Sequence, residues 1–286
     1  MRIQLRLTLA ALAVTLIAAP VARATDIYVL TNSAIGYSAT ETGFGRIDSS
    51  TGLFTLIATL NGSVTNLAWN PAGNNFFVTE GELSQSTTFR TLETNGTLSN
   101  SLGATLKRIY GMAYRGADST LYGYDYDSND TGTINSSNGA WSVLNTSPGV
   151  SVNSPAGGRY TILGDTLYMA VDRSGSGRFG TMGYTSTSSF QETTNNSVYT
   201  KLVLANDGAT MYGIYGNGTA GAQQLYTINP ADGALTAGPT ITGTGLARYF
   251  HGAAIVPVPE PSTYALAAIA SGVMAAVARR RKARQG

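Results

Sequence analysis

A short apolar–aromatic pattern recurs along most of the sequence and constrains the fold more than any other feature. Each copy centres an aromatic residue in a three-residue segment that favours a β-strand, and successive copies lie 44 to 49 residues apart. The five central residues are Tyr28, Phe77, Tyr122, Tyr168 and Tyr212. A period of this length, built from short strands, is typical of propellers and related arrays. The chain is therefore expected to repeat one small β-unit.

A second element, a polar turn with a glycine between two apolar residues, recurs at a similar spacing. Asn-Gly and Asp-Gly pairs adopt positive φ at low steric cost, so they reverse a strand into a hairpin. The clear copies span residues 47–54, 92–98, 134–141 and 228–235. The fourth copy, residues 182–190, lacks the glycine of the turn and is the weakest of the five.

Each repeat contains a strand, a turn, the aromatic strand, a longer loop, a third strand, the glycine turn and a last strand. Four antiparallel strands per repeat make a propeller blade. Residues 25–257 hold five such repeats of about 46 residues each. This region begins on a second strand, residues 26–30, and ends on a first strand, residues 251–256.

The two ends of this region can therefore complete one blade together, which removes the open sheet edges that promote aggregation. We predict an all-β fold, a β-propeller of five four-stranded blades in which the N- and C-terminal strands share one blade. A β-sandwich or an irregular β-solenoid is the alternative.

The composition excludes several kinds of site. The chain has no cysteine and one histidine, so disulfides, thiol catalysis, cysteine-ligated zinc and multi-histidine metal sites are excluded. The single histidine, His251, has no evident catalytic partner in the sequence, and we expect it to be structural. We predict no catalytic residues, no bound cofactor and no enzymatic activity.

The N-terminus has the pattern of a secretory signal peptide, residues 1–24. Arg2 and Arg6 form a positive segment, residues 7–19 are apolar, and Ala22 and Ala24 occupy the small-residue positions of a cleavage site. We therefore expect the chain to be exported through the inner membrane.

The C-terminus has three parts in a fixed order. Residues 258–263, with Pro259, Glu260 and Pro261, form an extended polar segment. Residues 264–278 are apolar and predict a short transmembrane helix. Residues 279–286 are basic and begin with Arg279, Arg280 and Arg281, which should stay on the cytoplasmic side. An apolar segment this short suits a temporary anchor better than a permanent one.

This three-part tail resembles the PEP-CTERM sorting signal of Gram-negative bacteria. The resemblance covers only the region 258–286 and is carried by Pro259, Glu260, Pro261 and the arginine cluster. It implies processing by an exosortase, transient contact with the inner membrane, and a final place at the cell surface or outside the cell. Proteins with such tails commonly occur in bacteria that make exopolysaccharide and biofilm.

The charge of the exported region differs from that of the whole chain. The full sequence carries a formal net charge of +2, but residues 25–257 contain ten Lys and Arg against 15 Asp and Glu, a net charge of −5. An acidic, sparsely charged domain is a poor binder of nucleic acid. We therefore expect no nucleic-acid partner.

One acidic segment is a weak calcium candidate. Asp125, Asp127 and Asn129 place oxygen ligands at alternate positions, as at the start of a calcium loop. Two departures weaken the match, because Asp130 stands where a glycine would turn the chain and Ser136 where a glutamate would close the site. The alternative is a solvated loop between two strands of the third blade.

The tyrosines allow two interpretations. Tyr28, Tyr122, Tyr168 and Tyr212 occupy matching strand positions and are expected to pack between blades. A platform for stacking sugar rings would instead use aromatic residues at loop tips. The candidates for such a platform are Tyr37, Tyr124, Tyr126 and Tyr215.

The leading functional prediction is an exported, exosortase-sorted propeller that binds extracellular polysaccharide or surface proteins, or has a structural role, without catalysis. The alternative is a secreted carbohydrate-active hydrolase or lyase with two carboxylates facing each other in the propeller channel. A third possibility is a scaffold with no specific ligand. The candidate carboxylates are Asp48, Glu80, Glu82, Asp172 and Asp207.

Overall fold

The computed structural model describes residues 25–32, 40–81, 87–146, 148–149, 159–173, 176–216, 218 and 223–257. The chain divides into two compact units, one of which comprises Ala24–Val256. The predicted signal peptide and the sorting tail from residue 258 onward lie outside the described residues, and so does the predicted transmembrane helix.

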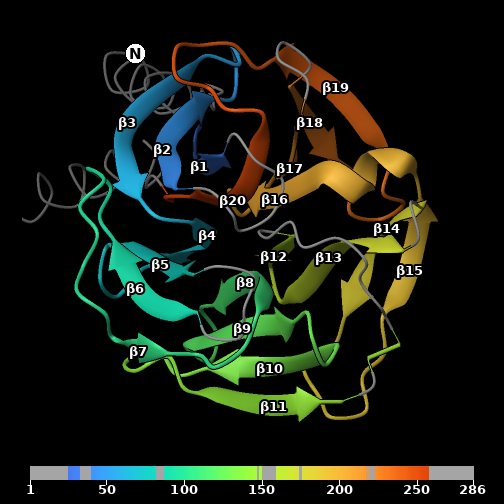
Figure 1. Cartoon of the computed structure of the whole chain (residues 1–286). Helices are drawn as coiled ribbons and strands as arrows, with labels where there is room; N and C mark the ends of the chain where they lie inside the picture. Colours follow the sequence, from blue (N-terminus) through green and yellow to red (C-terminus); the bar gives the residue numbers. More distant parts are fainter. Residues whose placement is uncertain are drawn as a thin grey trace, which may run out of the picture. The chain divides into compact units, whose positions relative to one another are not determined.

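Within the described residues, twenty strands form five antiparallel four-stranded sheets arranged around a common centre (Figure 1). Blade 1 contains β20 (Tyr249–Ile255), β1 (Asp26–Asn32), β2 (Glu41–Asp48) and β3 (Phe54–Asn61). Blade 2 contains β4 (Val64–Asn70), β5 (Asn75–Glu80), β6 (Thr88–Leu92) and β7 (Gly103–Ala104). Blade 3 contains β8 (Ile109–Arg115), β9 (Thr120–Asp125), β10 (Asp130–Ile134) and β11 (Trp141–Asn145).

Blade 4 contains β12 (Tyr160–Leu163), β13 (Thr166–Arg173), β14 (Ser176–Met182) and β15 (Gln191–Asn195). Blade 5 contains β16 (Leu202–Asn206), β17 (Met211–Tyr215), β18 (Gln224–Ile228) and β19 (Leu235–Thr240). A short 3-10 helix, η1 (Ser197–Lys201), links blades 4 and 5. The predicted five-bladed, all-β propeller is confirmed.

The register shows that the repeated aromatic residues are structurally equivalent. In every blade the aromatic residue of the second strand is paired with one residue of the third strand. The five pairs are Tyr28–Arg46, Phe77–Thr91, Tyr122–Thr133, Tyr168–Thr181 and Tyr212–Thr227. Because the same position recurs in each sheet, the period in the sequence corresponds to one blade.

The ring closes through blade 1, as the sequence predicts. Strand β20 pairs with β1 in an antiparallel register that includes Ile27–Ile255, Val29–Ala253 and Leu30–Gly252. Gly252 lies against the backbone of Asn66 and Leu67 in β4, where a side chain would clash. A glycine is therefore required where the innermost strands of blades 1 and 2 approach each other.

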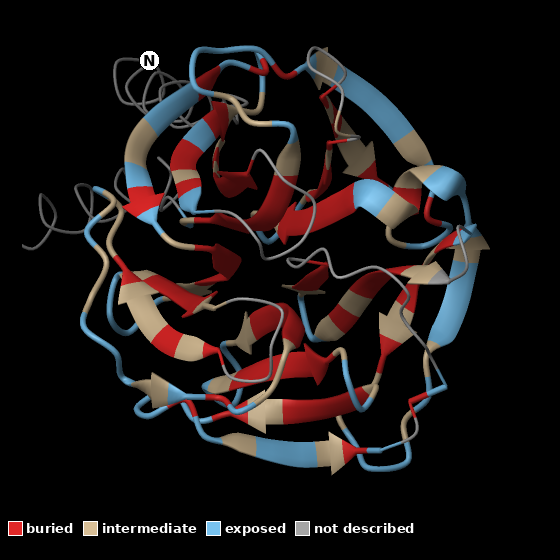
Figure 2. Cartoon of the chain, viewed as in Figure 1, coloured by how far each residue is buried: buried red, intermediate tan, exposed pale blue. Residues whose placement is uncertain are grey.

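The core consists of five apolar clusters, each of which joins two neighbouring blades. One cluster, for example, packs Ile27 and Ile255 of blade 1 against Val203 and Ile214 of blade 5. The other four join blades 1 and 2, 2 and 3, 3 and 4, and 4 and 5. Burial is highest on the inner strands, whereas outer strands such as β15 and β19 are largely exposed (Figure 2). Each blade is thus stabilised mainly by the two blades beside it.

The tight turns of the blades share one face of the ring, which we call the hairpin face. It carries the turn between the third and fourth strands of each blade and, in blades 2 to 5, the turn between the first and second strands. These turns include residues 71–74, 116–119, 164–165 and 207–210, and residues 49–53, 135–140, 183–190 and 229–234. The first residue of β1 and the last of β20 lie at this same face, because Ile27 pairs with Ile255.

We expect deletion of residues 25–30 to destabilise the whole ring and not just one end, since β1 joins β20 to the rest of blade 1. Urea unfolding followed by tyrosine and tryptophan fluorescence should show one transition at a clearly lower midpoint. Leu56→Ala on β3, whose side chain is 39% exposed, is the control and should lower the free energy of unfolding by about 1 kcal/mol. An unchanged midpoint for the deletion would contradict closure through a shared blade.

Candidate functional site

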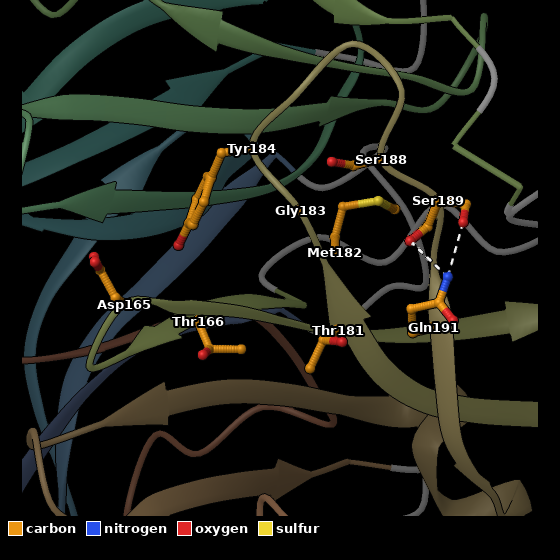
Figure 3. Close-up of a pocket in the computed structure, with 9 residues that line it drawn as sticks. All are labelled: Asp165, Thr166, Thr181, Met182, Gly183, Tyr184, Ser188, Ser189 and Gln191. Carbon is orange, nitrogen blue, oxygen red and sulfur yellow. Dashed lines mark hydrogen bonds between the residues drawn. The ribbon is translucent and has the colours of Figure 1, made fainter.

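A pocket of about 440 Å³ lies at the hairpin-face end of blade 4. Thr166 begins β13, Thr181 and Met182 end β14, and Gln191 begins β15, so three strands of the blade contribute to it. The turn residues Asp165, Tyr184, Ser188 and Ser189 complete most of the wall (Figure 3). Tyr184 and Asp165 lie on one side, and the two serines and Gln191 on the other.

The pocket coincides with the repeat whose turn departs from the other copies. Residues 182–190 separate Thr181 from its pairing partner Gln191 on the fourth strand. This segment is one residue longer than the segments between the equivalent pairs of blades 1, 3 and 5, which are residues 47–54, 134–141 and 228–235. In those three segments a glycine with positive φ closes the turn, at Gly52, Gly139 and Gly233. The longer turn in blade 4, without this glycine, has a different course.

The turn of blade 4 is held by its neighbour in the ring. The amide of Asn145, at the end of β11, donates a hydrogen bond to the carbonyl oxygen of Ser188. The backbone N–H of Phe190 donates to the carbonyl oxygen of Pro148 at 2.6 Å. Within the turn, the hydroxyls of Thr185 and Ser188 are 2.7 Å apart. The pocket wall is therefore anchored and not a free loop.

An arginine of blade 3 fixes the aromatic side of the pocket. Arg115, the last residue of β8, forms ion pairs with Asp118 at 2.8 Å and with Asp165 at 2.9 Å. Its guanidinium carbon lies 4.3 Å from the ring centroid of Tyr184. The Tyr122 ring lies 4.7 Å from the Tyr184 ring, and its hydroxyl donates to Asp118 at 2.9 Å. These contacts hold Tyr184 in one orientation and give the carboxylate of Asp165 a cationic partner, which it shares with Asp118.

Burial raises the pKa of Tyr184 above its ordinary range, and the nearby Arg115 only partly offsets this effect. The Tyr184 hydroxyl is therefore neutral at physiological pH. Its oxygen is buried and has no hydrogen-bond partner among the described residues.

Sequence patterns alone did not single out Arg115, Thr181, Tyr184 or Gln191 as site residues. The available signal was the irregular fourth turn, because insertions and departures in one repeat often mark a binding face.

The calcium candidates lie at the opposite face of the ring, at the end of β9 and in the loop before β10. The Asp125 carboxylate is fully buried and accepts hydrogen bonds from Lys107 at 2.8 Å and from Ser128 at 2.5 Å. Asp127 forms an ion pair with Arg108 at 2.9 Å, and the side-chain oxygen of Asn129 accepts from the Tyr124 hydroxyl at 2.8 Å.

The candidate ligands thus already have protein partners. No group of three or more His, Cys, Asp or Glu side chains within the described ranges is arranged to hold a metal ion.

The structure shows which of the tyrosines pack in the core and which could lie at loop tips. Tyr28 lies 5.1 Å from Phe76 of blade 2, ring centre to ring centre, which confirms packing between blades at that position. Tyr124 is fully buried within β9, so it cannot offer a stacking surface at a loop tip. Tyr126 stacks on Tyr110 at 6.2 Å and Tyr215 is the last residue of β17, whereas Tyr37 lies outside the described residues. His251 is buried on β20.

The buried Asp125 predicts a pH-dependent contribution to stability. Burial alone would raise its pKa, but the hydrogen bonds from Lys107 and Ser128 outweigh burial and hold the pKa below its ordinary value. Since the folded-state pKa is the lower one, the contribution is present at neutral pH and is lost as the pH falls through about 4 and below.

Asp125→Asn should therefore reduce the free energy of unfolding by about 2 kcal/mol at pH 7. Urea unfolding between pH 7 and pH 3 should show the difference between the parent protein and the variant shrinking at the acidic end. The half-exposed Asp127→Asn is the control and should cost less than about 1 kcal/mol. A difference that stays constant across this pH range would rule out the proposed linkage.

The calcium hypothesis stays a prediction with a direct test. If calcium binds at this loop, Asp125→Ala combined with Asp127→Ala should lower the melting temperature more in calcium than in a chelator, because only the bound state loses ligands. Scanning calorimetry in both buffers measures the difference. Equal melting temperatures of the parent protein in the two buffers would remove calcium from this site.

The comparisons with known proteins concern the tail and the overall fold. Residues 257–282 match the family model described as the PEP-CTERM protein-sorting motif. No curated protein matches the chain. Within the described ranges, no helix is both long and apolar enough to cross a membrane.

Three solved structures illustrate the likeness of the fold. A chain in the crystal structure of a nidogen/laminin complex has a TM-score of 0.49 and 9% identity, with 81% of this chain and 98% of that chain covered. TolB from Acinetobacter baumannii has a TM-score of 0.46 and 13% identity, with coverage of 74% and 52%, so this chain spans about half of that structure. A putative 6-phosphogluconolactonase from Bacteroides uniformis has a TM-score of 0.40 and 11% identity, with coverage of 77% and 84%.

With TM-scores below 0.5, these likenesses carry no argument about the activity of this chain. The informative match is the tail. The chain combines a five-bladed β-propeller with a PEP-CTERM sorting motif, which indicates export and exosortase-mediated localisation at the cell surface.

Proposed function

We propose that this protein is a non-enzymatic surface propeller that binds extracellular polysaccharide of the bacterium that exports it. The observation that carries the proposal is the position of the sorting motif. It begins at residue 257, two residues after the closing strand β20 ends at Ile255. The whole propeller therefore precedes the sorting motif in the sequence and is the part of the chain that the motif would sort.

The state of the carboxylates favours binding over hydrolysis. A glycosidase needs two facing carboxyl groups, and the general acid among them needs a raised pKa. Six carboxylates in addition to Asp165 form ion pairs with Lys or Arg at 4 Å or less. These are Asp26, Glu80, Asp118, Asp125, Asp127 and Glu192.

The pKa shifts point in the same direction. Hydrogen bonds lower the pKa values of Asp48, Asp118 and Asp125 below the ordinary range, with burial opposing them in each case. A lowered pKa keeps a carboxyl group ionised, which is the opposite of what a general acid requires.

The acids expected for the hydrolase alternative are also dispersed. Asp48 and Asp207 accept hydrogen bonds within turns at the hairpin face. Glu80 ends β5 and pairs with Arg90, and Asp172 lies near the end of β13, both toward the opposite face. Glu82 lies outside the described residues. This dispersal supports a binding role.

The test uses the protein isolated from its native host. Its intact mass should correspond to a chain that begins after Ala24 and ends near Pro259–Pro261. The isolated protein should sediment with insoluble exopolysaccharide from the same host and should release no reducing sugar from it. Release of reducing ends would favour the hydrolase alternative, and failure to sediment would contradict polysaccharide binding.

A matched control separates sorting from binding. Arg279→Ala, Arg280→Ala and Arg281→Ala change only the basic tail, so the propeller is untouched. This variant should be missorted in the host, while the extracted protein still binds the polysaccharide. Loss of binding in the extracted variant would mean that association with the polysaccharide depends on correct sorting and is not a property of the propeller alone.

A further inference from the structure

We propose that the pocket of blade 4 at the hairpin face is a binding site for an uncharged saccharide. The inference rests on the proposed function, because it assigns a site and a ligand class to the polysaccharide binding described above. Four observations carry it: the polar groups of the lining, the absence of an available cation in that lining, the fixed aromatic wall and the absence of the common turn in this blade.

The lining offers hydrogen-bonding groups that are not used within the protein. The hydroxyls of Thr166 and Thr181 have no hydrogen-bond partner among the described residues. The amide nitrogen of Gln191 donates to Ser189 at 2.8 Å, which orients the amide and leaves its oxygen as an acceptor. Sugar hydroxyls both donate and accept hydrogen bonds, so they match a mixed set of hydroxyl and amide groups.

The charge of the pocket selects against acidic ligands. Its lining contains one carboxylate, Asp165, and no Lys or Arg. Arg115 pairs with this carboxylate but is shared with Asp118, so both guanidinium edges are occupied and the group of three keeps a net negative charge. A uronic acid or a phosphate group would therefore meet no available cation in the pocket and would be repelled by the net negative exported region.

The aromatic wall gives the pocket a rigid apolar surface. Tyr184 is held by contacts with Arg115 and Tyr122, so little conformational entropy is lost when a ligand packs beside it. Met182 also lines the pocket, near its centre in Figure 3, although most of its side chain is buried in the core between blades 3 and 4. A pocket of about 440 Å³ with an apolar wall and a few oriented polar groups has the properties of a small-molecule site.

The equivalent turns in three other blades are tight hairpin turns. Gly139 and Gly233 lie so close to Phe89 and Thr194 that a side chain would clash, and Gly52 lies equally close to Thr240. These turns pack against the preceding blade and leave no comparable space at their glycines. The departure of residues 182–190 from this pattern creates the pocket in blade 4.

The test compares two isosteric double variants of the full chain. Thr181→Val with Gln191→Leu removes one hydroxyl and one amide from the pocket while the side chains keep similar volumes. Thr227→Val with Thr236→Val is the matched control, because Thr181–Gln191 and Thr227–Thr236 are equivalent pairs of blades 4 and 5. Circular dichroism melting should give the same transition temperature for both variants as for the parent.

Binding is measured first on an array of neutral and uronic-acid-containing oligosaccharides, and then by titration calorimetry with the neutral oligosaccharide that binds best. The parent and the control variant should bind neutral members with equal affinity, and the pocket variant should bind at least about tenfold more weakly. Tyr184→Phe removes only the buried hydroxyl, so it should retain its fold and bind neutral oligosaccharides as tightly as the parent.

The outcomes separate the site from the function. If the parent binds neutral oligosaccharides but the pocket variant binds equally well, this site is wrong and polysaccharide binding stands. If the parent binds only acidic members, the assigned ligand class is wrong. If the parent sediments with no exopolysaccharide and binds no member of the array, the proposed function fails and the site fails with it.

Discussion

The pairing of β1 with β20 is the interaction on which the rest of the structure depends. These strands lie more than 200 residues apart in the sequence, yet they form adjacent strands of one sheet. An open array of five sheets would leave the apolar faces of blades 1 and 5 in water. Closure buries Ile27, Val29 and Ile255 of blade 1 with Val203 and Ile214 of blade 5, so every blade has two neighbours.

Hydrogen bonds also join neighbouring blades around the ring. The Asn66 amide of blade 2 donates to the carbonyl oxygen of Ile109 in blade 3 at 2.9 Å. The Asn206 amide of blade 5 donates to the carbonyl oxygen of Ile162 in blade 4, also at 2.9 Å. These side-chain amides thus join the backbones of successive inner strands, where an unsatisfied carbonyl would be costly. Apolar clusters supply most of the burial, and these bonds help to set how the blades meet.

Within this regular frame, blade 4 combines the common register with an unusual turn. Tyr168 and Thr181 keep the pairing found in the other blades, so the sheet itself is normal. The departure is confined to residues 183–190, which blade 3 holds through Asn145 and Pro148. The strands supply a rigid base and the turn supplies variation, which is how repeat folds acquire individual sites without losing stability.

The sequence by itself determined the blade, the number of blades and the shared-blade closure, because strand period and glycine turns are local properties that recur at Tyr28, Phe77, Tyr122, Tyr168 and Tyr212. It also determined the cellular destination, since a sorting motif is recognised as a linear segment. Tertiary structure decided the candidate pocket. Arg115 and Asp165 lie 50 residues apart and meet only because blades 3 and 4 pack side by side. It also decided that Tyr124 is buried and that Asp125 already has Lys107 as a partner, because burial and charge pairing depend on contacts that no local pattern encodes.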